Sequence, residues 1–483
     1  MRHRTEANSA TAPHRRAIAS VALLLLGIPL ATACAGMLKT SVNIPLADDY
    51  DEIVGLLYQY VHTHGPLARI EWVLTASHSE YKLILLNAAV ALQYHLIGHT
   101  NFRALQLLGD LSVPATLLLL SLLLARQRRP FQQAIWLILV PWYLFLSLCY
   151  FETVNWATCG LQELAVIPLS VASVFFFTST VRHATLWGTL FLTLSIAAFG
   201  SGFTLALALL LLLIFQRRRR AALAVALTAC VMFGIYHVHR THLPGTPLPP
   251  PGGFLAFLFA FLGGLLPTVP LSIAFGVFLL AGFLFLLTRG WVRLSPDTFC
   301  LALFCLITAA VVARGRYILG VETAMSSRYR MYPLLLVSAE YLAALRILVP
   351  QRLQLRSLWA APIGFAAFAA VWFGITSQMH AYRLLHARQR ALTAHLILWE
   401  RHPERLVLVP DGAGFLYGDA WIPFRVRAQE DLQQSIAAGL YIPPVTAQDP
   451  LPVKPHTDST RGIEDESWPP PPAGAVSKHP GSS

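Results

Sequence analysis

Long apolar runs separated by short polar stretches make up most of the chain. Between residues 17 and 376, these runs recur at lengths that can cross a hydrocarbon core, which takes about 17 to 25 helical residues. The pattern predicts an all-α polytopic membrane protein.

The composition agrees with this prediction. Of 483 residues, 55% are hydrophobic and only 12% are charged. The formal net charge is +12, but most Lys and Arg lie in short stretches between apolar runs, so the basic excess indicates membrane topology and not nucleic-acid binding. The six cysteines form no CxxC pair and mostly fall within apolar runs, so we expect neither a disulfide framework nor a zinc site.

The basic clusters determine the predicted topology, because positively charged loops favour the cytoplasmic side. Six clusters can all be cytoplasmic if the chain crosses the membrane about eleven times. They are the N-terminal arginines, 126–129, 182–183, 216–220, 289–293 and 351–356. The N-terminus is then inside and the C-terminus outside. The predicted spans are 17–37, 104–124, 131–149, 162–181, 184–200, 202–215, 221–238, 270–288, 297–313, 332–349 and 358–376.

There are two further apolar stretches, 81–97 and 254–266. If either crossed the membrane, the basic loops after it would change sides. We expect both to be interfacial or re-entrant helices on the outer face. The alternative is a bundle of about thirteen crossings with some arginines outside.

The N-terminus allows a second interpretation. Arginines precede the apolar run 17–30, as in a cleaved signal peptide, and Ala31-Thr32-Ala33-Cys34 resembles a lipoprotein cleavage site without its usual Leu. The spans downstream and the charge parity favour an uncleaved first helix.

Polarity also divides the chain into regions. We expect a transmembrane domain over 1–376 and a small extracytoplasmic appendage over 377–444, with a helix at 381–400, a strand at 405–409 and an ordered stretch at 431–440. Residues 445–483 are rich in Pro, Ser and Lys and cannot bury a core, so we expect a disordered tail.

Four carboxylates, Asp48, Asp49, Asp51 and Glu52, follow the first predicted span, and an amphipathic pattern comes directly after them. Crowded carboxylates repel one another, which raises the pKa of at least one of them. Such a group can act as a general base or bind a divalent cation, Mg²⁺ or Mn²⁺. The alternative is a solvated acidic turn that caps a helix N-terminus.

A second polar group, His78, Glu80 and Lys82, opens the stretch 81–97. An imidazole, a carboxylate and an ammonium at the edge of an amphipathic segment can form a polar rim for a lipid-linked substrate. The alternative is interfacial anchoring by Tyr81 and a snorkelling Lys82.

A third polar group lies between the third and fourth predicted spans. It runs from Glu152 through Asn155 to Gln162 and Glu163, and Glu163 is about one turn inside an apolar run. A carboxylate within a span is costly and indicates function, unless it marks a helix end at the interface.

The most informative group holds Arg314, Arg316, Arg328 and Arg330, which the other clusters place outside. Guanidinium groups at the outer lipid boundary suit two-pronged hydrogen bonds to phosphate. The alternative is that this loop is cytoplasmic and the parity is shifted by one crossing.

In this order, the four groups resemble motifs of GT-C type membrane glycosyltransferases, which use polyprenyl-phosphate sugars, and more closely a group of uncharacterised bacterial members. Asp48-Asp49-Tyr50 is similar to their acidic pair before an aromatic, and Gly315-Arg316 with Ser327-Arg328-Tyr329 is similar to their later basic pair. Asn155, Trp156, Gly160 and Gln162 match a third motif loosely. Residues 78–82 depart from a His-Asn-Glu-His-Arg motif, because Tyr81 and Lys82 replace His and Arg.

The resemblance implies an inverting transfer of one sugar from a polyprenyl-phosphate donor to an extracytoplasmic glycan or lipid acceptor, in a bacterial inner membrane. It implies Asp49 or Asp48 as the base, and Arg328, Arg316 and Lys82 at the donor phosphate. The expected substrate-binding residues are Glu80, His78, Glu52, Asn155, Gln162 and Tyr329.

Two rival functions remain open at this stage. A transporter or lipid-carrier flippase predicts charged residues in mid-membrane and broken helices in matching halves. A catalytically inactive membrane scaffold predicts little effect when Asp49 is replaced by Asn.

Overall fold

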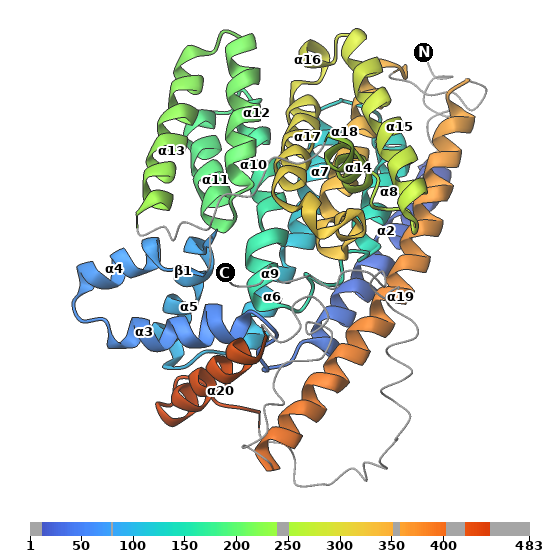
Figure 1. Cartoon of the computed structure of the whole chain (residues 1–483). Helices are drawn as coiled ribbons and strands as arrows, with labels where there is room; N and C mark the ends of the chain where they lie inside the picture. The colour runs from blue at the N-terminus through green and yellow to red at the C-terminus, as the bar shows by residue number, and fades with distance from the viewer. Residues whose placement is uncertain (1–11, 79–80, 239–250, 351–357, 402–420, 445–483) are drawn as a thin grey trace. The chain divides into compact units, whose positions relative to one another are not determined.

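The structure is a computed structural model that describes residues 12–78, 81–238, 251–350, 358–401 and 421–444 (Figure 1). Most of these residues are helical. A two-stranded antiparallel hairpin, β1 (Ser77–His78) with β2 (Tyr81–Lys82), is the one sheet in the described part of the chain.

The first half of the chain forms α-helices and two π-helical segments. They are α2 (Ala12–Thr40), η1 (π, Tyr50–Gly55), α3 (Leu56–His62), α4 (Pro66–Thr75), α5 (Ile84–Ile97), α6 (Phe102–Asp110), α7 (Ser112–Ala125), α8 (Phe131–Leu146), α9 (Ala157–Cys159), η2 (π, Gly160–Leu164) and α10 (Val166–Phe177).

The second half adds longer helices and three 3₁₀ turns. They are α11 (Ala184–Ala198), α12 (Gly202–Phe215), α13 (Arg219–His237), α14 (Pro251–Leu262), α15 (Val269–Thr288), α16 (Trp291–Leu294), α17 (Pro296–Arg316), η3 (Tyr317–Leu319), η4 (Val321–Met325), η5 (Ser327–Tyr329), α18 (Met331–Ile347), α19 (Ala360–Arg401) and α20 (Trp421–Ala437).

Six helical stretches in the described residues are long and apolar enough to cross a membrane. Each predicted span coincides with helix, but several of these helices are shorter, including α11 and α12. The predicted all-α membrane class is therefore confirmed, whereas helix length does not establish the number of crossings. The six stretches are Phe102–Ala125, Ala157–Phe177, Arg219–His237, Val269–Thr288, Pro296–Leu319 and Ala360–Ala394.

Loops that carry basic clusters meet at one end of the long helices. Arg126, after α7, donates to the carbonyl of Phe175 (2.8 Å) and to Thr178 Oγ1 (3.1 Å) at the end of α10. Arg218, after α12, donates to the carbonyl of Phe177. Arg129 donates to carbonyls of the turn after α18, at Val349 (3.1 Å) and Pro350 (3.0 Å). These basic groups satisfy the carbonyls that helix C-termini leave unpaired.

The buried apolar side chains form two clusters. The larger one lies between the long helices, and a smaller one joins η1, α3, α5 and α20 around Tyr50, Ile53, Leu86 and Tyr441. Most buried apolar side chains of α5 belong to this smaller cluster. In α14, Gly253 lies against Tyr317, and Gly264, just after the helix, lies against the backbone of Ala324. Both ends of α14 thus meet the same η3–η4 segment.

The boundary predicted at Ser377 lies inside α19, which continues without a break to Arg401. Leu385, Leu392 and Leu396 keep one face of this helix buried beyond the change in polarity, so the change does not end the helix. The described residues up to Pro443 form one compact unit. The predicted helix at 381–400 is part of α19, and 431–440 overlaps the end of α20. The predicted strand at 405–409 and the tail at 445–483 lie outside the described residues.

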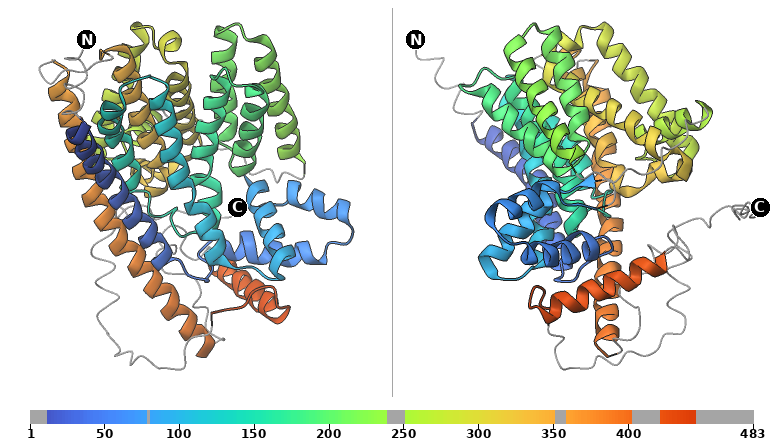
Figure 2. Two further views of the ribbon diagram at one scale, coloured as in Figure 1. Left: turned by 180° about the vertical axis from the view of Figure 1, so that it is seen from behind. Right: turned by 60° about the vertical axis from the view of Figure 1, so that its left-hand side comes forward.

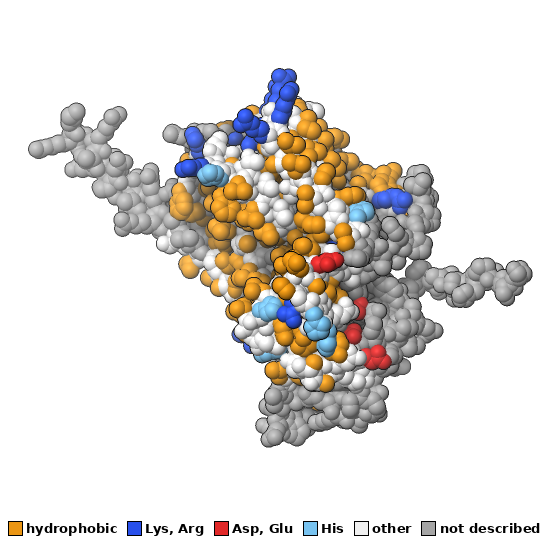
Figure 3. Space-filling view, turned by 90° about the vertical axis from the view of Figure 1, so that its left-hand side faces the viewer, with side chains coloured by type: hydrophobic (Ala, Val, Ile, Leu, Met, Phe, Trp, Pro, Cys, Tyr) orange, Lys and Arg blue, Asp and Glu red, His pale blue; other side chains and the backbone are white. Residues whose placement is uncertain are grey.

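Helices α2 and α19 run side by side (Figure 2). The Tyr382 hydroxyl donates to the carbonyl of Thr32, and Gln389 Nε2 donates to that of Lys39 (3.0 Å). A side chain at Gly36 would collide with the Tyr382 ring, so glycine permits the close approach. On the face drawn in Figure 3, Lys and Arg gather mainly at one end of an apolar belt, and Asp and Glu lie nearer the other end.

Candidate catalytic site

Asp49 is fully buried in the turn before η1. Its Oδ2 accepts the backbone N–H of Leu46 (3.0 Å), and its Oδ1 accepts both the N–H (2.9 Å) and the hydroxyl (2.7 Å) of Thr158. Burial raises the pKa of Asp49 to about 7, and these hydrogen bonds oppose the rise. Asp49 therefore ties the chain after α2 to the start of α9.

The neighbouring carboxylates differ in exposure. Asp48 is half-buried, whereas Glu52 is buried within η1. Burial raises the pKa of Glu52 well above its usual value, the charges of Asp48 and Asp49 raise it further, and a hydrogen bond with Thr158 opposes the rise. Of the four predicted carboxylates, Asp48 and Asp51 are half-buried and can be reached by a ligand, whereas Asp49 and Glu52 are enclosed.

Both π-helical segments carry acidic side chains of this region. Glu52 lies in η1, and Gln162 and Glu163 lie in η2, where all three are buried. π-Helical turns are rare and occur frequently at functional sites, because the extra residue turns side chains away from the regular helical face. The two segments thus share a local feature that sequence patterns do not reveal.

Asn155 holds the loop before α9 in place. Its backbone lies in the left-handed region (φ +52°), its Nδ2 donates to Thr40 Oγ1 (2.5 Å), and its N–H donates to Asp110 Oδ1 (3.2 Å). Nearby, Gly109 of α6 lies directly against the backbone of Gly160, where no Cβ fits. The end of α2, α6 and η2 therefore converge here.

Glu152 joins this loop to the segment before α18. Its Oε2 accepts Ser326 Oγ (2.9 Å) and the N–H of Arg328 (3.0 Å), and its own N–H donates to Ser327 Oγ (3.2 Å). From α19, Arg388 donates to three carbonyls of the same loop, at Phe151 (3.1 Å), Glu152 (3.2 Å) and Val154.

Two guanidinium groups lie over one buried aromatic ring. The Cζ atoms of Arg328 and Arg316 are 5.1 Å and 5.9 Å from the ring centroid of Tyr329. Burial by itself lowers the pKa of Arg328, but Tyr329, Glu163 and other acidic neighbours outweigh it, so the net pKa lies above its ordinary value. Arg328 therefore remains a cation.

Residues far apart in the sequence meet in this region. Glu163 interacts electrostatically with Arg328, Arg316 and Asp48. Glu163 Oε2 and Arg328 Nε are both buried without a hydrogen-bond partner among the described residues. Buried polar atoms without partners are uncommon, and they indicate a place where a ligand can supply the missing partner.

Lys82 lies elsewhere. Its Nζ donates to the carbonyls of Thr75 and Val238, each at 2.5 Å, and burial lowers its pKa. Neither of these bonds brings it to the segment that carries Arg316 and Arg328. The reason is that β2 places Lys82 between the ends of α4 and α13, where its ammonium satisfies two helix-terminal carbonyls. The side chain of His78 and all of Glu80 lie outside the described residues.

Sequence reasoning missed Thr158 and Arg388. Thr158 contacts Asp49 and Glu52, but no motif or unusual position distinguishes it in the sequence. Arg388 could have been found as a cation on the helical face that also carries Ala381 and Leu385, which are buried. Among the described residues, no group of three or more His, Cys, Asp and Glu is arranged to hold a metal ion. Comparisons with protein-family models, curated proteins and solved structures find no match.

Proposed function

We propose that the chain is an inverting membrane glycosyltransferase of GT-C type, which moves a sugar from a polyprenyl-phosphate donor to an extracytoplasmic glycan or lipid acceptor. One observation carries the proposal: hydrogen bonds fix both the acidic turn and the Arg328 segment to the same stretch, residues 152–158, through Asp49 with Thr158 and through Glu152 with Arg328. The acceptor hydroxyl needs a base and the leaving phosphate needs a cation, so the reaction requires both charges at one site.

In the proposed reaction, Asp48 takes the proton of the acceptor hydroxyl as its oxygen attacks the anomeric carbon. The bond from that carbon to the phosphate oxygen breaks, and polyprenyl phosphate leaves with the bonding electrons. Arg328 and Arg316 stabilise the phosphate charge that develops. The attack comes from the face opposite the leaving group, which inverts the anomeric centre.

Asp49 acts as a positioning residue in this mechanism. Its two oxygens accept three hydrogen bonds from Leu46 and Thr158, so it fixes the turn that carries Asp48. At Asp49 these donors occupy three of about four acceptor positions, which leaves one for a divalent cation, Mg²⁺ or Mn²⁺, shared with Asp48. We assign no step to a metal.

The proposed topology has about eleven crossings in a bacterial inner membrane, with the N-terminus cytoplasmic, the C-terminus extracytoplasmic, and α5 and α14 not crossing. Contacts among the basic loops after α7, α10, α12 and α18 support a common cytoplasmic end. The carboxylate and guanidinium site then faces the outer leaflet, where a lipid-linked donor is confined to the bilayer.

The test is transfer by purified full-length protein in detergent, supplied with radiolabelled polyprenyl-phosphate sugars and lipid or glycan acceptors. We expect turnover with one donor, and a loss of about a hundredfold or more in Asp48→Asn and in Arg328→Gln. Arg383→Gln, on an exposed part of α19, is the control and should retain activity. Absence of turnover with every donor would favour the inactive scaffold.

A transporter or lipid-carrier flippase is the second candidate, and one observation favours it. Glu340 lies within α18, its Oε1 is buried without a hydrogen-bond partner among the described residues, and it faces Gly282 of α15. Ionisable side chains within spans commonly serve transport. The test reconstitutes the parent protein and Glu340→Gln in vesicles. This alternative is supported if the parent protein flips the lipid carrier but transfers no sugar, and if Glu340→Gln loses the flipping.

A further inference from the structure

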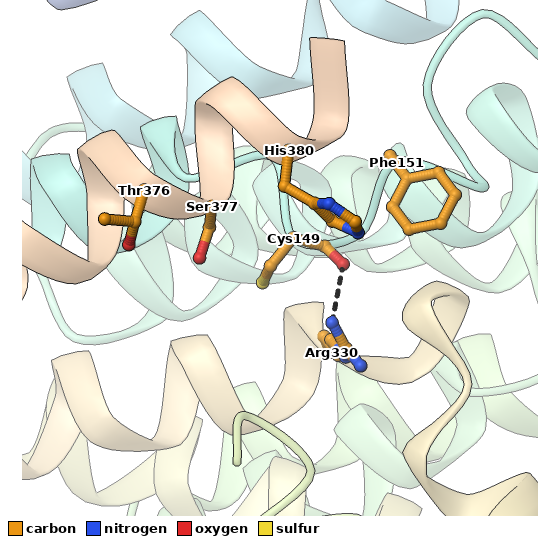
Figure 4. Close-up of a pocket in the computed structure, with 6 residues that line it drawn as sticks. All are labelled: Cys149, Phe151, Arg330, Thr376, Ser377 and His380. Carbon is orange, nitrogen blue, oxygen red and sulfur yellow. Dashed lines mark hydrogen bonds between the residues drawn. The ribbon is translucent and has the colours of Figure 1, made fainter. Parts of the chain in front are cut away.

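A cavity of about 320 Å³ lies between the start of α18 and the middle of α19 (Figure 4). It is a different feature from the proposed catalytic site, since Asp48, Glu163 and Arg328 do not line it. Its lining comes from the loop after α8, from the residue directly before α18 and from α19. It consists of Cys149, Phe151, Arg330, Thr376, Ser377 and His380.

The cavity has a cation and no carboxylate in its lining. Arg330 makes one long hydrogen bond, from Nη1 to the carbonyl of Cys149 (3.4 Å), and its Nε is buried without a partner among the described residues. A guanidinium has five N–H donors in a planar fork that matches an oxyanion. Most of the donor capacity of Arg330 is therefore available to a ligand.

Polar groups of α19 face Arg330 across the gap. Ser377 and His380 are about one turn apart, and their side chains point from α19 toward the space that Arg330 enters from the opposite side (Figure 4). Neither side chain makes a hydrogen bond to another described residue. The Thr376 hydroxyl donates to its own helix, at the carbonyl of Trp372 (2.8 Å). A hydroxyl and an imidazole thus complete a set of donors for an anion.

The surroundings of the cavity are apolar. Trp372, Ile375 and Met379 are exposed on α19 beside the lining residues, in a stretch apolar enough to cross a membrane. A ligand that reaches Arg330 from this side meets hydrocarbon, so an amphiphile fits better than a freely soluble ion. The volume is small for a ligand pocket and suits a headgroup.

We propose that this cavity binds a phosphate group, carried by an anionic lipid whose chains lie along the exposed face of α19. Arg330 holds the phosphate oxygens, with Ser377 and His380 as further donors. The site is independent of sugar transfer, so it stands or falls separately from the proposed function.

The test measures binding to the purified full-length protein by native mass spectrometry, with dioctanoyl phosphatidic acid as the probe and dioctanoyl glycerol as the uncharged control. We expect dioctanoyl phosphatidic acid to bind, and we expect no binding of dioctanoyl glycerol, which lacks the phosphate. Arg330→Gln should weaken binding at least tenfold, and His380→Ala and Ser377→Ala several-fold. Arg383→Gln, on an exposed part of the same helix, should bind like the parent protein.

The phosphate could come from a lipid headgroup or from inorganic phosphate in water. A measurement with inorganic phosphate distinguishes these two sources. If it raises the Tm of the parent protein but not of Arg330→Gln, while phosphatidic acid fails to bind, the cavity is a phosphate site filled from water and the lipid is excluded. Should Arg330→Gln not fold, His380→Ala and Ser377→Ala supply the same comparison. Unchanged binding in the variants that fold, or equal binding of both lipids with no effect of phosphate, would overturn the proposal.

Discussion

Asp48 and Asp49 are neighbours in the chain but occupy different environments. Asp48 is half-buried and within electrostatic reach of Glu163, whereas Asp49 is enclosed and bonded to Leu46 and Thr158. We predict that Asp48→Asn lowers transfer about a hundredfold or more and leaves Tm nearly unchanged, because it removes a base without emptying a buried site. Retained transfer in folded Asp48→Asn would exclude Asp48 as the base.

The second residue-scale prediction concerns Asp49. An Asn at this position replaces one acceptor oxygen with an NH₂ group, which then faces the N–H of Leu46 or the donors of Thr158. Asp49→Asn should therefore lower the free energy of unfolding by about 1 to 3 kcal/mol. Urea unfolding in detergent measures this loss. If Asp49→Asn lost no more free energy of unfolding than Asp48→Asn, the positioning role of Asp49 would be contradicted.

The raised pKa of Asp49 predicts a pH dependence of stability. The folded state holds a proton up to about pH 7, whereas the ordinary value for the unfolded chain is 3.8, so the folded state binds more protons between these limits. The free energy of unfolding should therefore fall as pH rises through this window and level off above it.

Glu52 contributes a slope of the same sign, so the test compares the parent protein with Asp49→Asn. The slope between pH 4 and pH 7 should be smaller in Asp49→Asn. An equal slope in both proteins would assign the dependence to other groups.

At the scale of elements, Arg388 fastens α19 to the loop that carries Glu152 and Asn155. It donates to three loop carbonyls, at Phe151, Glu152 and Val154. Arg388→Gln should lower stability by about 3 kcal/mol or more, because buried carbonyls lose their partners, and transfer should fall with it. Thermal unfolding compares it with Arg390→Gln, an exposed position two residues along the same helix, which should behave like the parent protein.

The hairpin β1–β2 illustrates how an element changes the role of a residue. The sequence groups Lys82 with the other basic side chains. In the structure, β2 places it where its ammonium donates hydrogen bonds to the carbonyls of Thr75 and Val238. Lys82 as a donor-phosphate ligand therefore stays a prediction that none of its contacts supports.

At the scale of the whole molecule, sidedness is the property to test. Single cysteines at His64, Glu322 and Arg217, all exposed positions, can be labelled with a membrane-impermeant maleimide in intact cells after Cys34 and Cys230 are replaced. His64→Cys and Glu322→Cys should react from outside, and Arg217→Cys only after permeabilisation. Protection of Glu322→Cys in intact cells would place the Arg316 to Arg328 segment inside and remove it from the proposed reaction.

The sequence by itself determined the helical membrane class, the positions of the long helices and the basic loops, because the length and apolarity of a run are local properties. Only the tertiary structure decided that Asp49 is enclosed while Asp48 is reachable, and that α19 continues past Ser377. It also identified Thr158 and Arg388 as partners of the site. Burial and hydrogen-bond partners depend on which distant segments pack together, and a single sequence carries no direct record of that packing.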